Sequence, residues 1–510
     1  MSRLDAFRDD PAKRNHETYK DSLFTFTAPE YSTAEVLLGS LYRKLLLGVH
    51  DREVDLESVS ILINDIGKQW QREDIAEFLL ARRGGLASPI RSGQKGSIPY
   101  PQLMPLVPQI ARYACVLGKK RNRWYPGDLA LQVIGTGRGA NGNNLINQLQ
   151  TALAVTKDDS VFSRFVAQEL DTLRTPDPIP TITLDAGEVR AYRGTTRKDG
   201  HSPAEQCCDD IDLLLPLKTK LTRRQWTVLL EAMLRLGLPT HVLWVCHVNT
   251  IVWELALNAA GTATVPTTDD VEELVWTSHR DNPFLETGRD SVPAIKQLIE
   301  RYVIARFGIN IILYRLEEAN SPWPTAFIGH VPGNNQPTAA RIQAFLQYVA
   351  DHRTDINPTN AREWLRNEVS QLADKNLALL RCASGFTKNL LEFVRHSLGQ
   401  IEAQDAEQRS YDQSYLLSNT TGASRRSRLW PVNPGPAMLI VLAHSAATTT
   451  HGIPVSLEDF RSHLANYGIT VPPNELVRGK LTLDLQKLGL LVDSPDAAGG
   501  RLLVGPFPKG

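Results

Sequence analysis

The chain has 510 residues, of which 42% are hydrophobic and 22% charged, and these values exclude a wholly disordered protein. Its 56 basic residues balance 56 acidic ones, which excludes a protein that coats nucleic acid non-specifically, so any nucleic-acid contact must be local. Five cysteines are too few for a disulfide framework. Because the N-terminus is polar and polar residues interrupt the apolar stretches, we expect a cytoplasmic protein without membrane contact.

The first predicted elements are helical. Residues 1–30 are rich in charge and are expected to form an N-terminal lead-in. Leucines three and four residues apart then predict a helical domain over 31–180, which ends in the Pro-rich segment 175–180. Within this domain, residues 128–134 predict a strand and the Gly-rich residues 135–142 predict a turn.

A mainly helical middle domain with a few strands is expected over 181–404. A strong amphipathic pattern predicts a helix over 221–238, with Thr222 as its N-cap and Gly237 near its end. The apolar run 309–316 is the best strand candidate of this domain. Residues 405–436 are polar with a basic end and predict a linker.

The Gly-rich segment contains the pattern G-x-G-x-x-G, formed by Gly137, Gly139 and Gly142. Such a loop can deliver backbone N–H groups to a pyrophosphate when it joins a strand to a helix. Asp158 follows too closely, because a helix, a turn and a second strand cannot fit in between. A flexible turn is therefore favoured over a nucleotide site.

Three carboxylates, Asp177, Asp185 and Glu188, could gather a divalent metal in the manner of a nuclease. A basic residue follows at Arg190, but arginine cannot release a proton as lysine can. Asp185 and Glu188 are better explained as the flanks of a turn. A metal-dependent nuclease stays the third alternative for the function.

Two other clusters give no specific site. The set Cys207, Cys208, Cys246 and His247 lacks the paired spacing that structural zinc requires, and no metal or cofactor is expected. The basic and aromatic residues 119–125 suit either contact with nucleic acid or a solvated loop. Arg223 and Arg224, close to the start of the 221–238 helix, are expected on a solvated face.

Residues 437–510 follow a regular order of elements. An apolar helix leads to a short extended segment, and Ser456 caps a second helix that ends at Gly468. A third helix is expected over 475–489, capped by Asn474, and Gly479 predicts that it begins late or bends. Two apolar runs around a small polar tip then predict a hairpin.

This order, helix–strand–helix–helix–hairpin, resembles the winged helix-turn-helix family. The resemblance implies that the third helix enters the major groove of double-stranded DNA and that the hairpin contacts the backbone or minor groove. Together with the basic linker, the residues expected to contact nucleic acid are Arg478, Lys480, Thr482, Gln486, Lys487, Arg501, Arg425, Arg426 and Arg428.

We therefore expect a mainly α, multidomain protein that ends in a winged helix of α+β type. Its expected function is that of a nucleic-acid-associated binding component within a larger bacterial DNA-transaction or antiviral defence complex, and a binding role is favoured over an enzyme. Residues 437–510 carry six basic and six acidic residues, which is unusual for an autonomous DNA-binding domain. A winged-helix interaction or scaffold protein without DNA binding is therefore the main alternative.

Overall fold

Helices dominate the chain, as expected, and the strands among the described residues are two or three residues long. The computed structural model describes residues 1–20, 37–47, 106–109, 111, 126–173, 178–184, 201–321, 338–400, 412–418, 420–421, 428–449, 455–493 and 501–507.

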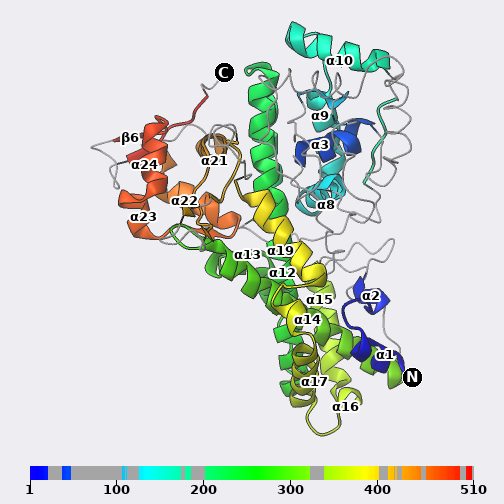
Figure 1. The fold of residues 1–510 in the computed structure, drawn as a ribbon. Helices are drawn as coiled ribbons and strands as arrows, with labels where there is room; N and C mark the ends of the chain where they lie inside the picture. The colour runs from blue at the N-terminus through cyan, green and yellow to red at the C-terminus, as the bar shows by residue number, and fades with distance from the viewer. Residues whose placement is uncertain are drawn as a thin grey trace.

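The 40-residue helix α12 (Arg223–Thr262) is the centre of the fold, and most other helices pack along it (Figure 1). Thr222 is its N-cap, as predicted, and exchanges two hydrogen bonds with Gln225 in a capping box. The helix does not end at Gly237, because that glycine serves close packing. A Cβ atom there would lie 2.1 Å from Sγ of Cys207 in the neighbouring helix α11 (Pro203–Leu214).

Shorter helices surround the N-terminal half of α12. Residues 128–134, predicted as a strand, lie inside α8, and the Gly-rich segment joins α8 to α9 as a corner between two helices. The elements besides α11 are α3 (Leu37–Tyr42), η1 (Arg43–Leu47), α8 (Pro126–Arg138), η2 (Gly139–Asn141), α9 (Gly142–Leu153), α10 (Val161–Leu173) and η3 (Leu215–Thr219).

A second group of helices packs along the C-terminal half of α12, at the lower end of Figure 1. The predicted strand 309–316 is wrong, since these residues continue helix α14, whose apolar side chains are buried on all sides. The elements are α13 (Thr268–Asp281), β1 (Leu285–Glu286), α14 (Ser291–Glu318), α15 (Thr338–Asp351), α16 (Arg353–Ile356), α17 (Ala361–Lys375), α18 (Leu377–Leu380) and α19 (Gly385–Leu398).

The charged lead-in includes two short helices, α1 (Arg3–Asp9) and α2 (Glu17–Lys20). The ring of Phe7 is fully buried, with its centroid 6.3 Å from that of Phe307 and 5.4 Å from that of Tyr314. These ring contacts attach helix α1 to α14.

Three buried charged side chains of α12 each hold a different segment of the chain. Arg223 pairs with Asp159 at 2.8 Å, and only 3% of its surface is exposed, so its predicted place on a solvated face is wrong. Glu231 accepts backbone hydrogen bonds from the first residues of α3, at 3.2 and 2.8 Å. Arg235 pairs with Asp412 at 2.7 Å, and its Nε donates to the carbonyl oxygen of Ser397 near the end of α19.

The main group of buried apolar side chains is continuous from α1 to the last strand. The division into separate domains therefore stays a prediction. Among the described residues, α12 is the one helix long and apolar enough to cross a membrane, and 94% of its most apolar window is buried in the structure. Core helices of soluble proteins meet the same test of length and composition.

Candidate nucleic-acid interface

The candidate interface lies in residues 436–507, which we call the tail module. Its element order is helix, strand, helix, strand, two short helices and two strands. These are α21 (Pro436–Thr449), β4 (Val455–Ser456), α22 (Leu457–Asn466), β5 (Ile469–Thr470), α23 (Pro473–Arg478), α24 (Lys480–Lys487), β6 (Leu491–Asp493) and β7 (Arg501–Leu503). Strands β2 (Thr420–Thr421) and β3 (Arg428–Leu429) precede the module and pair with each other.

Local sequence determines the ends of α22. Ser456 is the N-cap, as predicted, and its Oγ accepts from the backbone N–H of Asp459 at 3.1 Å. At the other end, Gly468 has a φ of 70°, a conformation that glycine adopts at little energetic cost. Both boundaries follow from residues within the segment itself.

The predicted third helix is interrupted at Gly479, whose extended backbone separates α23 from α24. A Cβ atom at this position would lie 2.4 Å from the backbone carbonyl oxygen of Glu475, so the break requires a residue without a side chain. Pro472, rather than the predicted Asn474, occupies the N-cap position of α23. The bend expected at Gly479 is thus present as a complete break.

Three antiparallel strands close the module in the order β4-β7-β6. Leu503 of β7 pairs with Val455 of β4 on one side and with Leu491 of β6 on the other. Val455 and Leu503 are buried, so this register directs one face of the sheet towards the helices of the module.

A buried polar network joins the tail module to α11. Oδ2 of Asp210 accepts from the Tyr467 hydroxyl at 2.6 Å and lies 3.1 Å from Nε2 of His463. The same carboxylate accepts from the side chain of Gln206 at 2.8 Å. Because a buried carboxylate needs such partners, the network specifies how α22 lies against α11.

Backbone pairing adds a second attachment. Strand β5 pairs in parallel with β1, and the carbonyl oxygen of Gly468 accepts from the N–H groups of Phe284 and Leu285 at 2.7 and 3.1 Å. Nε2 of His279 in α13 lies 3.1 Å from the carbonyl oxygen of Asn466. The tail module is therefore packed against the helical body on two sides.

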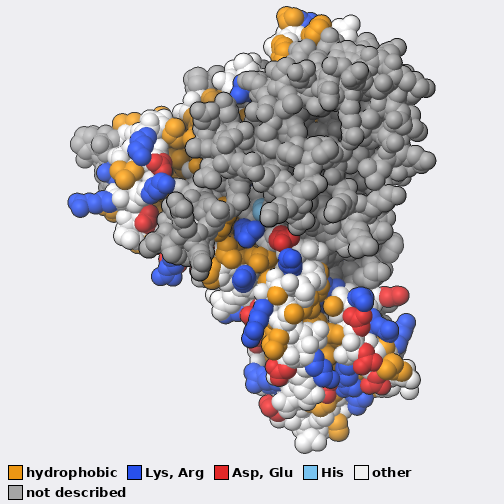
Figure 2. Space-filling view, viewed as in Figure 1, with side chains coloured by type: hydrophobic (Ala, Val, Ile, Leu, Met, Phe, Trp, Pro, Cys, Tyr) orange, Lys and Arg blue, Asp and Glu red, His pale blue; other side chains and the backbone are white. Residues whose placement is uncertain are grey.

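Three of the predicted contact residues lie on the outside of the module. Arg478, Lys480 and Lys487 are exposed, and Gln486 is half-buried. Nζ of Lys487 lies 3.0 Å from Oδ1 of Asp484, but 74% of the lysine side chain remains exposed. Figure 2 shows cationic and hydrophobic side chains together at this end of the molecule.

Two other predicted contact residues have partners within the module. Thr482 is 1% exposed, and its hydroxyl lies 3.0 Å from the carbonyl oxygens of both Glu475 and Leu476. It therefore stabilises the break between α23 and α24 and is not available to a surface partner. Nη1 of Arg501 donates to the carbonyl oxygen of Val477 at 2.8 Å, which holds β7 to the end of α23.

Several predicted groups lie outside the described residues. Arg425 and Arg426 of the linker belong to them, and Arg428 is described only as the backbone of β3. The basic and aromatic cluster 119–125 is also outside. The same holds for the carboxylates of the nuclease alternative, Asp177, Asp185 and Glu188.

Apolar side chains that the sequence pattern did not indicate are exposed on the tail module. Val477, Leu483 and Val492 are 58%, 49% and 51% exposed. Leu483 lies on the same side of α24 as Lys480 and Lys487, since it is three positions from the first and four from the second. A helical projection of 480–487 would have separated this outer face from the buried Leu481 and Leu485.

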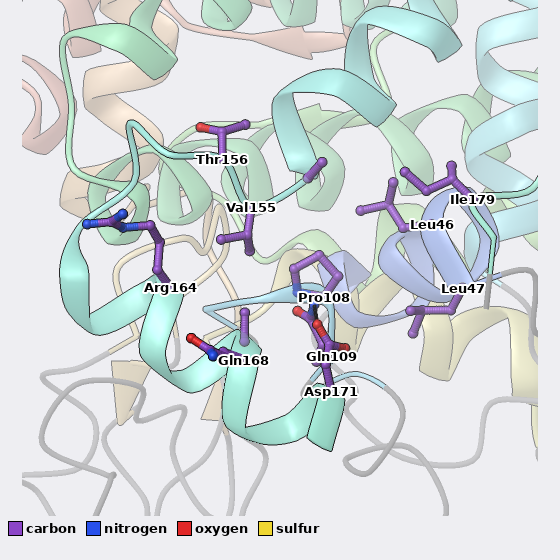
Figure 3. A pocket seen from close by; sticks show the side chains of 12 residues that line it. Leu46, Leu47, Pro108, Gln109, Val155, Thr156, Arg164, Gln168, Asp171 and Ile179 are labelled. Atoms are coloured by element: carbon purple, nitrogen blue, oxygen red, sulfur yellow. Dashed lines mark hydrogen bonds between the residues drawn. The ribbon is translucent and has the colours of Figure 1, made fainter. Parts of the chain in front are cut away.

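Described residues of the helical body line a smaller and a larger cleft. The smaller one, of about 430 Å³, has Arg164 and Gln168 of α10 on one side and Leu46, Leu47 and Ile179 on the other (Figure 3). The larger one, of about 990 Å³, lies between α9 and the start of α12 and is lined by cations.

No metal site is found among the residues that the structure describes, since they contain no group of three His, Cys, Asp or Glu that could hold an ion. Cys207, Cys208 and Cys246 are free and buried. Burial raises the pKa of all three thiols, which suits packing rather than metal binding or nucleophilic chemistry.

Comparisons of the chain with models of protein families, with curated proteins and with solved structures give no match.

Proposed function

We propose that the tail module is a winged helix and that the protein is a nucleic-acid-associated binding component, with duplex DNA as the partner of α23–α24. The proposal treats the protein as a DNA-binding subunit of a larger assembly rather than as an enzyme. One observation carries it, namely the exposed cations on the outer face of the two short helices.

The order of elements supports the first part of the proposal. A helix, a strand, a second helix, a short strand, two short helices and a hairpin succeed one another, and β4 pairs with β7. In winged helices this arrangement presents the last helical segment to the major groove and the hairpin to the flanking backbone.

The position of the cations supports the second part. Arg478, Lys480 and Lys487 are exposed, and α23 and α24 lie at the edge of the molecule, away from α14–α17 (Figure 1). Cations in such a position can neutralise phosphates without desolvating other charges of the protein. Gln486 adds a side chain that can read a base edge.

Fluorescence anisotropy with a labelled duplex tests this proposal on the full chain. We expect the variant Arg478→Ala, Lys480→Ala and Lys487→Ala, called the surface variant, to bind the duplex at least about tenfold more weakly than the wild type. The three side chains are exposed, so the variant should fold as the wild type does.

A matched control removes the same charge elsewhere. Lys13, Arg353 and Lys375 are exposed at the opposite end of the molecule, and their replacement by alanine, called the control variant, should leave the affinity unchanged. An equal loss in both variants would show that only net charge matters. Equal affinity of the surface variant and the wild type would disprove the assignment.

A second candidate function is protein docking without DNA binding, and the exposed apolar side chains favour it. Val477, Leu483 and Val492 are large, and each is about half exposed, which is typical of surfaces that a protein partner covers. This candidate predicts no duplex binding by the wild type. It also predicts that Leu483→Glu dissociates a complex isolated with the native protein, as measured by light scattering.

A further inference from the structure

The larger cleft lies away from the outer face of α23–α24 and is bounded by three segments. These are α9, the connection from α9 to α10, and the stretch from η3 to the first residues of α12. Its volume of about 990 Å³ is in the range of sites that bind small molecules. The volume admits a small molecule, and the side chains that line the cleft determine which kind.

A buried ion-pair network holds the walls in place. Asp159 accepts from Nε of Arg223 at 2.8 Å and from Nζ of Lys218 at 2.5 Å. Arg223 also donates to the carbonyl oxygen of Leu153 at 2.9 Å. Burial would raise the pKa of the Asp159 carboxyl, but the hydrogen bonds from Arg223 and Lys218 hold this pKa well below its ordinary value. The cleft therefore keeps its shape before any ligand enters.

The same network leaves positive charge in the cleft. Asp159 and Arg223 neutralise each other, and an ammonium group has three N–H groups, of which Lys218 uses one on Asp159. Lys220 is exposed and also lines the cleft. Asp158 is the other carboxylate of the lining, which therefore contains three cationic side chains and two carboxylates.

The opposite wall carries neutral hydrogen-bonding groups. Asn147 and Gln148 of α9 line the cleft with exposed carboxamides, each of which has an NH₂ group that can donate. Ammonium groups on one wall and carboxamides on the other suit a ligand with several anionic oxygen atoms and a polar body.

We propose that this cleft binds the phosphate groups of a nucleotide or of a nucleic-acid strand, with Lys218 and Lys220 as the cationic contacts. The ligand oxygens accept from the two ammonium groups, and the carboxamides of α9 contact the remainder of the ligand. Arg223 and Asp159 act as positioning residues that hold Lys218 and the cleft wall.

Calorimetric titration of the full chain with inorganic pyrophosphate at low salt tests this site. We expect Lys220→Glu to weaken binding at least about tenfold, because a charge contact is replaced by repulsion. Arg224→Glu is the matched control, since Arg224 is exposed close by but does not line the cleft. The affinity of the Arg224→Glu variant for pyrophosphate should stay within about twofold of that of the wild type.

Two further probes separate the sources of the phosphate. Tighter binding of a nucleoside triphosphate than of a single-stranded oligonucleotide assigns the cleft to free nucleotides, and the reverse order assigns it to a strand. No binding of pyrophosphate by the wild type would overturn the proposal, as would equal losses in the Lys220 and Arg224 variants. Duplex binding through α23–α24 involves other residues and is tested separately.

Discussion

The buried charges of α12 and the exposed cations of α23–α24 have different roles. Arg223, Glu231 and Arg235 are buried in the body, and each contacts a defined partner. Lys480 and Lys487 lie exposed on the tail module. The comparison shows that a cation in an amphipathic helix says little about function until its burial is known.

The difference has an energetic basis. A buried charge requires a partner, and removing that partner leaves a group that is neither solvated nor paired. An exposed charge stays hydrated when its neighbours change, so the free energy of unfolding changes little and the group remains available for a ligand. We therefore expect the buried charges of α12 to control stability and the exposed cations of α23–α24 to control binding.

The largest effect is expected at Arg223. Replacement of Arg223 by alanine leaves Asp159 buried without its main partner, and should lower the free energy of unfolding by about 3–5 kcal/mol. Urea denaturation measures this change. Arg224 is the exposed neighbour, and the free energy of unfolding of Arg224→Ala should stay within about 0.5 kcal/mol of the wild-type value. Similar losses in the two variants would show that burial of the charge does not determine its effect on stability.

A pH-dependent effect is expected at Glu231. Burial raises the pKa of this carboxyl to about 7 from an ordinary value of 4.5, so between these values the folded protein retains a proton that the unfolded chain releases. The free energy of unfolding should therefore decrease as the pH rises through this window, by about 3 kcal/mol from this residue.

The variant Glu231→Gln isolates that contribution. Its amide cannot titrate but its oxygen can still accept a backbone hydrogen bond from α3. Urea denaturation at a series of pH values should give a flatter profile for the variant than for the wild type, because all other titrating groups are shared. Parallel profiles would mean that Glu231 does not titrate in this range.

A smaller effect is expected at the attachment of the tail module. Tyr467→Phe removes the hydroxyl that donates to Asp210 and should destabilise the attachment by about 2 kcal/mol. Hydrogen exchange should become faster in α22 and leave α14 unchanged. Uniform acceleration across the chain would instead indicate that the module and the body unfold together.

The smallest effect on stability is expected for the surface variant. Since Arg478, Lys480 and Lys487 are exposed, its free energy of unfolding should stay within about 0.5 kcal/mol of the wild type. Thermal unfolding checks this. A larger loss would place these side chains among the structural charges, and would remove the distinction on which the proposed interface rests.

Features determined by nearby residues could be predicted from the sequence. Thr222 and Ser456 cap their helices as expected, because each partner, Gln225 and Asp459, lies three positions further along the chain. The order of elements in the tail module was also predictable from apolar spacing. The mainly helical character of the chain was predicted on the same basis.

Features determined by distant residues could not be predicted. The run 309–316 is apolar enough for a strand or a buried helix, and only its packing inside the fold decides. Arg223 was assigned to the surface because Asp159 is remote in sequence. Thr482 was expected to contact DNA, but its buried hydroxyl lies within reach of carbonyl oxygens of α23 beside the break at Gly479.

The salt dependence of duplex binding tests the central claim most directly. The logarithm of the affinity falls with the logarithm of salt concentration, with a slope of about −0.9 for each neutralised phosphate. If Arg478, Lys480 and Lys487 contact phosphates, the slope of the surface variant should be shallower by about two to three, while the control variant keeps the slope of the wild type. Identical slopes for the wild type and the surface variant would contradict DNA binding through α23–α24.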